Sequence, residues 1–179
     1  YFQKRTDVEQ LTELRPLVRR CTGGGLVRHD SDWTYSLAIP ATHAWYRLPA
    51  EVSYKILHQW IQRSLHRIGV STQLSPCCAK AIPGACFAGP EKFDLTLEDR
   101  KIAGAAQRRS REGLLIQGSL QGLPSQSDRS AWMQAMADCA DPALSNPGVK
   151  SELPQPVLVE AGGLERGRYT PSSGFQTRR

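Results

Sequence analysis

Residues 19–30 (RRCTGGGLVRHD) are the first segment whose side chains could do chemistry. The three consecutive glycines at 23–25 have no Cβ atoms, so a ligand can approach the backbone and hydrogen-bond to its N–H groups. The flanking Arg20 and His29 can pair with a phosphate or a carboxylate. The segment lacks the Gly-Lys-Ser/Thr ending of a nucleotide loop and the glycine spacing of a dinucleotide-binding turn. One interpretation is a binding loop for an anion or a carbonyl oxygen; the other is a glycine hairpin with solvated arginines.

Lys101 and Cys86 are two further candidates for chemistry. Lys101 opens a predicted strand and is followed by small residues, so its ammonium can stabilise negative charge that develops on a carbonyl or phosphoryl oxygen. Cys86 lies in a long loop rich in proline and glycine, where its thiolate can act as a nucleophile if neighbouring cations or backbone donors stabilise it. The ordinary alternatives are a solvated hairpin lysine and a small buried hydrophobic residue.

The other cysteines and histidines do not indicate a metal site. Cys77 and Cys78 are adjacent, and their separation from Cys86 fits no common zinc pattern. His58 and His66 are expected to be solvated or to cap the helix that contains them. We therefore expect no bound metal.

Regular elements must position these residues, and the periodicity of apolar residues predicts where they lie. The predicted strands cover residues 17–18, 32–40, 93–97, 101 onward and 114–118. The predicted helices cover residues 7–14, 49–69 and 127–140, the last capped by Ser127 or Asp128. The loop 71–92 and a linker at 141–156 separate them. The residues expected to face inward from the two longer helices are Val52, Ile56, Trp60, Ile61, Leu65, Ile68, Trp132, Met133 and Met136. These elements predict an α+β fold in which a mixed or antiparallel sheet packs against helices.

Composition and charge narrow the class of protein. The chain has 179 residues and a mass of 19.8 kDa, which suits one globular domain. No apolar run approaches the roughly 18 residues that a membrane span needs. Five scattered cysteines argue against a disulfide scaffold and for reduced, cytosolic thiols. The net charge of +6 suits nucleic acid, a membrane surface or an acidic protein, and does not choose between them.

Two motifs in a fixed order carry a family resemblance. Residues 19–30 and 101–109 (KIAGAAQRR), with LLIQGSL at 114–120, resemble lipoate–protein ligases and octanoyltransferases, which are relatives of biotin–protein ligases. The resemblance covers nearly the whole chain, most clearly residues 17–40 and 86–120. It implies that residues 1–179 form a single biotin/lipoate protein ligase-like catalytic domain that lacks its N-terminal segment. Tyr1-Phe2-Gln3 would then be the end of a strand rather than a tag.

The resemblance also implies roles for individual residues. Lys101 would contact the activated acyl carbonyl and, in a ligase, the adenylate phosphate. Cys86 would be the nucleophile, as in a subset of octanoyltransferases and amidotransferases with a similar Cys-Phe pair. The residues implied to line or support the acyl pocket are Arg20, Gly23, Gly24, Gly25, His29, Gly104 and Ala105. An eight-carbon chain is held there mainly by burial, at about 0.8 kcal/mol per methylene.

Three features favour acyl transfer over ATP-driven ligation. Cys86-Phe87 precedes the strand at Asp94, residues 32–36 (DWTYS) replace the Gly-Asn that ligases tend to have after His-Asp, and no residues remain for an accessory domain. We therefore expect a cytoplasmic acyltransferase that needs no cofactor. It would take octanoyl from an acyl-carrier protein onto Cys86 as a thioester. It would then pass the group to a lysine of the lipoyl domains of 2-oxoacid dehydrogenases or of the glycine cleavage protein.

Two alternatives stay open. An ATP-dependent lipoate–protein ligase would use ATP and Mg²⁺ to make lipoyl-AMP, with Cys86 merely packed. A non-catalytic relative would bind an acyl protein without turning it over. Since carrier and lipoyl domains are typically acidic, the basic charge then favours them as partners over nucleic acid or a membrane.

Overall fold

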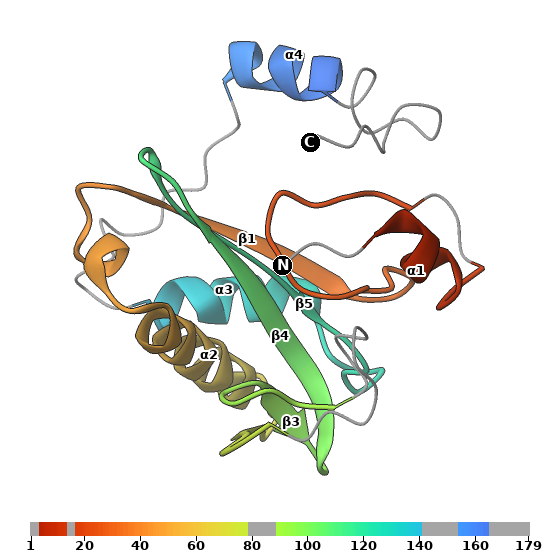
Figure 1. Ribbon diagram of the computed structural model, residues 1–179. Coiled ribbons are helices and arrows are strands. Elements are labelled where there is room, and N and C mark those ends of the chain that lie inside the picture. Colours follow the sequence, from red (N-terminus) through yellow and green to blue (C-terminus); the bar gives the residue numbers. More distant parts are fainter. Residues whose placement is uncertain (1–3, 14–16, 79–88, 141–153, 165–179) are drawn as a thin grey trace. The chain divides into compact units, whose positions relative to one another are not determined.

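The computed structural model describes residues 4–13, 17–78, 89–140 and 154–164. The chain divides into two compact units, the larger of which contains Thr22–Gly148. Its centre is a five-stranded sheet with the strand order β1-β5-β4-β3-β2 (Figure 1). The strands are β1 (Trp33–Pro40), β2 (Gln73–Leu74), β3 (Leu95–Leu97), β4 (Arg100–Arg109) and β5 (Gly113–Leu120). Every neighbouring pair is antiparallel, which confirms the predicted α+β class and resolves the choice between a mixed and an antiparallel sheet.

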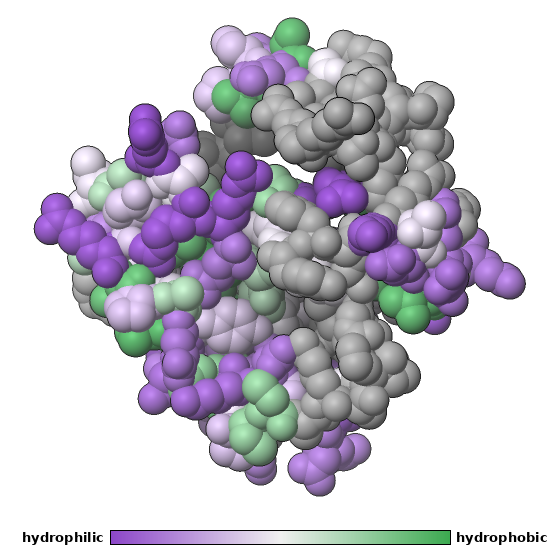
Figure 2. Space-filling model, viewed as in Figure 1, coloured by the Kyte–Doolittle hydropathy of each residue, from purple (hydrophilic) through white to green (hydrophobic). Residues whose placement is uncertain are grey.

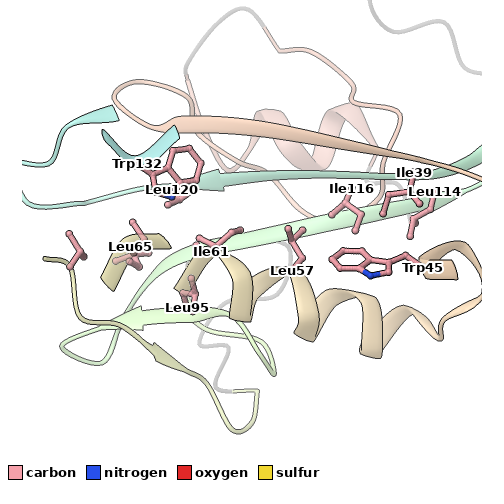
Figure 3. Packing of buried hydrophobic residues seen from close by; sticks show 13 residues of the cluster. Ile39, Trp45, Leu57, Ile61, Leu65, Leu95, Leu114, Ile116, Leu120 and Trp132 are labelled. Carbon is pink, nitrogen blue, oxygen red and sulfur yellow. The ribbon is translucent and has the colours of Figure 1, made fainter. Parts of the chain in front are cut away.

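One face of the sheet packs against helices α2 (Ala50–Arg67) and α3 (Arg129–Asp138). Alternating residues of β1 put Ile39 into this core and leave Thr34, Ser36 and Ala38 exposed on the other face. Figure 3 shows the aliphatic and indole side chains that fill the space between sheet and helices. They include Ile39, Trp45, Leu57, Ile61, Leu65, Leu95, Leu114, Ile116, Leu120 and Trp132. The helices therefore fix which side of each strand is available for a site.

The two longer helices begin where the sequence predicts. α2 starts after Pro49, and Gly69 follows its end with a φ of 81°, a left-handed conformation that suits glycine. The Asp128 side chain accepts a hydrogen bond of 2.8 Å from the Ser130 backbone N–H, so Asp128 caps α3.

The inward faces of these helices differ from the prediction. Leu57, Ile61 and Leu65 are buried, whereas Val52 is 40% exposed, because the buried stripe of α2 is rotated relative to the expected one. His58 lies on this stripe in the middle of α2 and is wholly buried, so the expectation that it is solvated or caps the helix was wrong. In α3, Trp132 is buried as predicted, but Met133 is 56% exposed.

Other segments also depart from the prediction. Residues 17–20 form no strand, and the first helix, α1, covers Arg5–Glu9 rather than 7–14. The two residues of β2 lie inside the predicted loop 71–92, where they pair with β3. The smaller unit contains α1 and also α4 (Gln155–Leu164), which the sequence analysis did not predict. The apolar residues of α4 show too little helical periodicity for the sequence alone to distinguish this helix from a linker.

Among the coloured residues of Figure 2, the surface carries no broad apolar patch. Hydrophilic side chains predominate among the coloured residues, and hydrophobic ones form small separate groups. Within the described part of the chain, no helix has both the length and the apolar composition needed to cross a membrane.

Candidate functional site

A β-bulge in β4 sets the side of the strand on which Lys101 lies. Leu95 of β3 pairs with Ala103, while the next residue, Thr96, pairs with Lys101, so Ile102 has no opposite residue. Ile102 and Ala103 consequently both lie in the hydrophobic core although they are adjacent in the chain. The extra residue reverses the alternation, and Lys101 shares a side of the strand with Gly104.

The head group of Lys101 is held in a buried ion pair. Its Nζ atom lies 2.7 Å from Oδ2 of Asp94, with the Lys101 side chain 5% exposed and the Asp94 side chain wholly buried. The same carboxylate oxygen accepts a hydrogen bond of 2.6 Å from the backbone N–H of Glu91. The Tyr54 hydroxyl donates to the other oxygen, Oδ1, and accepts a hydrogen bond of 3.0 Å from the backbone N–H of Ala105. Both carboxylate oxygens are thus engaged, and the lysine is fixed by groups from α2, β4 and the turn before β3.

Gly104 leaves the room that this ion pair needs. A Cβ atom at position 104 would lie 2.8 Å from both Cε and Nζ of Lys101 and 3.1 Å from Oδ1 of Asp94. Ala105 packs against the core with its side chain and supplies its N–H to Tyr54. The proposal that Gly104 and Ala105 leave space for an acyl chain stays a prediction, and the structure adds that Gly104 makes space for Lys101.

The buried cluster also sets the protonation of its neighbours. Burial, reinforced by the charge of Asp94, raises the pKa of the Tyr54 and Tyr35 hydroxyls, so both keep their protons. Burial lowers the pKa of His58 to about 4, so its imidazole is neutral near pH 7. The His58 ring packs on Tyr54 with 4.1 Å between the ring centroids. Lys101 and Asp94 are therefore the ionic pair at the centre of this cluster, and neutral rings surround it.

A second polar network joins the residues that precede β1 to β5. Nδ1 of His29 is 2.8 Å from Oδ2 of Asp32, and the Ser119 hydroxyl donates to the same oxygen at 2.6 Å. A carboxylate only accepts, so the imidazole donates its Nδ1–H to it. Ser119 lies directly opposite Gly104 across β4 and β5, where Cβ positions are about 4.5–5.5 Å apart. The His29 network and the Lys101 ion pair therefore occupy the same face of adjacent strands.

The glycine segment begins on this face too. Thr22 is buried, and its hydroxyl donates a hydrogen bond of 3.0 Å to Oε1 of Gln117 on β5. Gly24 has a backbone φ of 99°, a value that residues with a Cβ atom rarely adopt, so this position requires glycine. The turn geometry agrees with both interpretations of Gly23–Gly25, because a ligand loop and a plain hairpin need the same backbone.

Two predicted residues, Arg20 and Cys86, lie outside the unit or the residue ranges described above. Arg20 belongs to the smaller unit. Cys86 lies outside the described residues, so its role as nucleophile stays a prediction. Across the described ranges, no group of three or more His, Cys, Asp or Glu side chains could hold a metal ion.

Asp94, Tyr54 and Asp32 are residues to which the sequence analysis assigned no role. Asp94 directly precedes a buried strand residue, Leu95, but neighbouring residues of a strand alternate between its faces, so the sequence contained no sign that this carboxylate is buried. Its partner, Lys101, also depends on the bulge. Tyr54 lies one turn before His58 on α2 and could be placed only once the inward face of the helix was known.

Comparisons with known proteins agree with the resemblance and the fold. A family model described as the lipoyl protein ligase A/B catalytic domain matches residues 1–151. Octanoyltransferase LipM of Staphylococcus epidermidis is 34% identical over 130 residues, which are 66% of this chain and 46% of that protein. Octanoyltransferase LipM of Brevibacillus brevis is 32% identical over 134 residues, 67% of this chain and 48% of that protein. The chain spans about half the length of the curated relatives it matches.

Solved structures share the architecture at low sequence identity. A lipoate-protein ligase A bound with ATP aligns with a TM-score of 0.68 and 16% identity, covering 92% of this chain and 72% of that one. A bi-partite lipoate protein ligase of Thermoplasma acidophilum, described with its E2 lipoyl domain, aligns with a TM-score of 0.65 and 15% identity, covering 90% of this chain and 72% of that one. These likenesses confirm the predicted fold.

Proposed function

The chain belongs to the lipoyl protein ligase A/B catalytic domain family, and on this premise we propose that it transfers an octanoyl group to a lysine of a lipoyl domain. The observation that carries the proposal is the buried Lys101 ammonium, held by Asp94 next to the small residue Gly104. The names of the curated relatives, octanoyltransferase LipM, support transfer over ligation.

The proposed reaction has two acyl-transfer steps. The Cys86 thiolate attacks the thioester of an octanoyl carrier protein, a new C–S bond forms, and the carrier leaves as its thiolate and takes up a proton. The neutral ε-amine of the target lysine then attacks the Cys86 thioester, the C–N bond forms, and the amine proton passes to the departing Cys86 sulfur. Each step places negative charge on the carbonyl oxygen, and the Lys101 ammonium is the group that stabilises it.

The partners follow from the same chemistry. We propose an acyl-carrier protein as donor and the lipoyl domains of 2-oxoacid dehydrogenases or of the glycine cleavage protein as acceptors. The net charge of +6 suits the acidic surfaces that such domains typically present. Because this reaction exchanges one acyl bond for another, it needs neither ATP nor a metal, and we propose that it takes place in the cytoplasm in a single catalytic domain.

The ligase alternative differs in what it requires. Formation of lipoyl-AMP consumes ATP with Mg²⁺, and free lipoate is then the acyl source. The glycine segment 23–25 and the Lys101 ammonium would be the groups to meet the phosphate in that case. Dependence on ATP therefore separates the two reactions.

The thioester on Cys86 is the intermediate to look for. After incubation with octanoyl carrier protein, intact-mass measurement should show one added octanoyl group on the chain, and neutral hydroxylamine should remove it. Cys86→Ala should abolish the adduct, while Cys77→Ser, which changes an exposed thiol, should keep it. An adduct that persists in the Cys86→Ala chain would contradict the proposed nucleophile.

A further inference from the structure

We propose that Asp94 is the positioning residue for Lys101 and that Tyr54 fixes Asp94 in turn. This inference rests on the proposed function, since it concerns how the ammonium that stabilises the oxyanion is held. The juxtaposition that carries it is the ion pair of 2.7 Å between Lys101 Nζ and Asp94 Oδ2, with the Tyr54 hydroxyl on Oδ1.

Asp94 has the contacts of an anchor rather than of a surface partner. Its carboxylate is wholly buried, and it accepts hydrogen bonds from the Glu91 backbone and from Tyr54 in addition to the ammonium. Hydrogen bonds on both oxygens leave the carboxylate little freedom to rotate. The Lys101 ammonium is therefore paired with a carboxylate whose own position is fixed.

An exposed pair in the same unit provides the contrast. Lys92 Nζ also lies 2.7 Å from a carboxylate oxygen, that of Glu51, but these side chains are 50% and 61% exposed. An exposed pair is screened by solvent, so it fixes its lysine weakly. A buried pair interacts in a medium of low effective dielectric, where losing one partner leaves an uncompensated charge. The two ion pairs have the same N–O distance, but only the buried pair holds its lysine firmly in place.

The contacts around the pair fix the position of the Lys101 ammonium in addition to burying it. Tyr54 accepts the Ala105 N–H while donating to Asp94, so the hydroxyl is itself fixed between α2 and β4. Gly104 provides the space in which the ammonium sits. Since buried ion pairs contribute little net stability compared with apolar packing, an arrangement that uses a helix, a strand and a turn to hold one ammonium suits a catalytic task.

Steady-state kinetics of octanoyl transfer test this role. Asp94→Asn should lower kcat by about 100-fold, the loss that a misplacement of roughly 1 Å produces, with KM for the octanoyl carrier changed less than about threefold. Tyr54→Phe keeps both charges and should lower kcat by about tenfold. Glu51→Gln, the matched control on the exposed pair, should leave kcat unchanged.

A double-mutant cycle separates positioning from general structural damage. If Asp94 acts through Lys101, Asp94→Asn should reduce the residual rate of the Lys101→Ala chain by less than about threefold. An unchanged kcat in folded Asp94→Asn would overturn the proposal, and so would a full additional loss in the Lys101→Ala background. Should Asp94→Asn fail to fold, the same cycle with Tyr54→Phe decides.

Amine labelling gives a readout that does not need transfer activity. With a small amine-reactive reagent and peptide mass measurement, labelling of Lys101 should be slow in the wild-type chain and several-fold faster in Tyr54→Phe, with unchanged thermal unfolding. Labelling of Lys92, whose side chain is 50% exposed, should be fast in the wild-type chain and should change little in Glu51→Gln. Unchanged Lys101 labelling in both Tyr54→Phe and folded Asp94→Asn would overturn the positioning role. If Lys101 labelling changes in the variants as expected but the wild-type chain transfers no octanoyl group, the positioning role stands and the proposed function is contradicted.

Discussion

Replacement of Gly104 by alanine tests how closely Lys101 is positioned. The new Cβ atom would lie 2.8 Å from Lys101 Nζ, whereas ordinary contact begins at 3.4 Å, so the ammonium must retreat by about 0.6 Å to reach an ordinary contact. Because the obstructed atoms are the far end of a flexible side chain, the cost in unfolding free energy should be only about 1 kcal/mol. A displacement of roughly 1 Å at a reacting group costs about 100-fold in rate, so we expect kcat to fall roughly tenfold.

The assay is the kcat of octanoyl transfer, measured beside thermal unfolding. Gly163→Ala is the matched control, because a Cβ atom at position 163 meets nothing within 4 Å. The control should keep wild-type kcat, and the Gly104→Ala loss should disappear in the Lys101→Ala background. A folded Gly104→Ala chain with the kcat of the control would refute the reasoning that the place of the Lys101 ammonium limits the reaction.

Two further predictions concern stability. A Cβ atom in Gly118→Ala would lie 2.2 Å from Cζ and Oη of the Tyr35 ring. This overpacking should lower the unfolding free energy, measured by urea denaturation, by about 1–3 kcal/mol. A loss under about 0.5 kcal/mol would mean that the ring moves aside freely. The pKa of His58 is lowered from 6.5 to about 4, so the unfolded chain binds more protons between these values, and this contribution to stability is present above pH 6.5 and lost as the pH falls toward 4. The loss of unfolding free energy should be about 2 kcal/mol at about pH 5. His58→Leu should remove this loss, and the control His66→Gln should retain it. Equal pH dependence in the wild type and both variants would contradict a neutral buried His58.

Local patterns predicted the elements that depend on nearby residues. The strict alternation in 32–40 sets the two faces of β1, and Asp128 caps α3 because the capping bond joins it to Ser130, only two residues away. Lys101 could be singled out because a lysine at the start of a strand followed by small residues is a local feature. These parts of the fold and the site were predictable because their causes lie within a few residues.

Features that depend on distant contacts were not predictable in the same way. The bulge at Ile102 follows from the register between β3 and β4, and the sequence of β4 alone does not show which residue lacks an opposite partner. The inward side of α2 is set by packing against the sheet and α3, and this packing buries His58, a residue type of only intermediate burial. The Asp94–Lys101 pair needs both features, so the lysine was proposed from the sequence without its partner.

The most direct test of the account is octanoyl transfer to a lipoyl domain in the absence of ATP. The purified chain would be incubated with octanoyl carrier protein and the lipoyl domain, and the intact mass of the domain would be followed for the wild-type and Lys101→Ala chains. The account predicts that the domain gains one octanoyl group without ATP and much more slowly with Lys101→Ala. A domain modified only when free acid, ATP and Mg²⁺ are supplied, or modified equally fast by both chains, would contradict it.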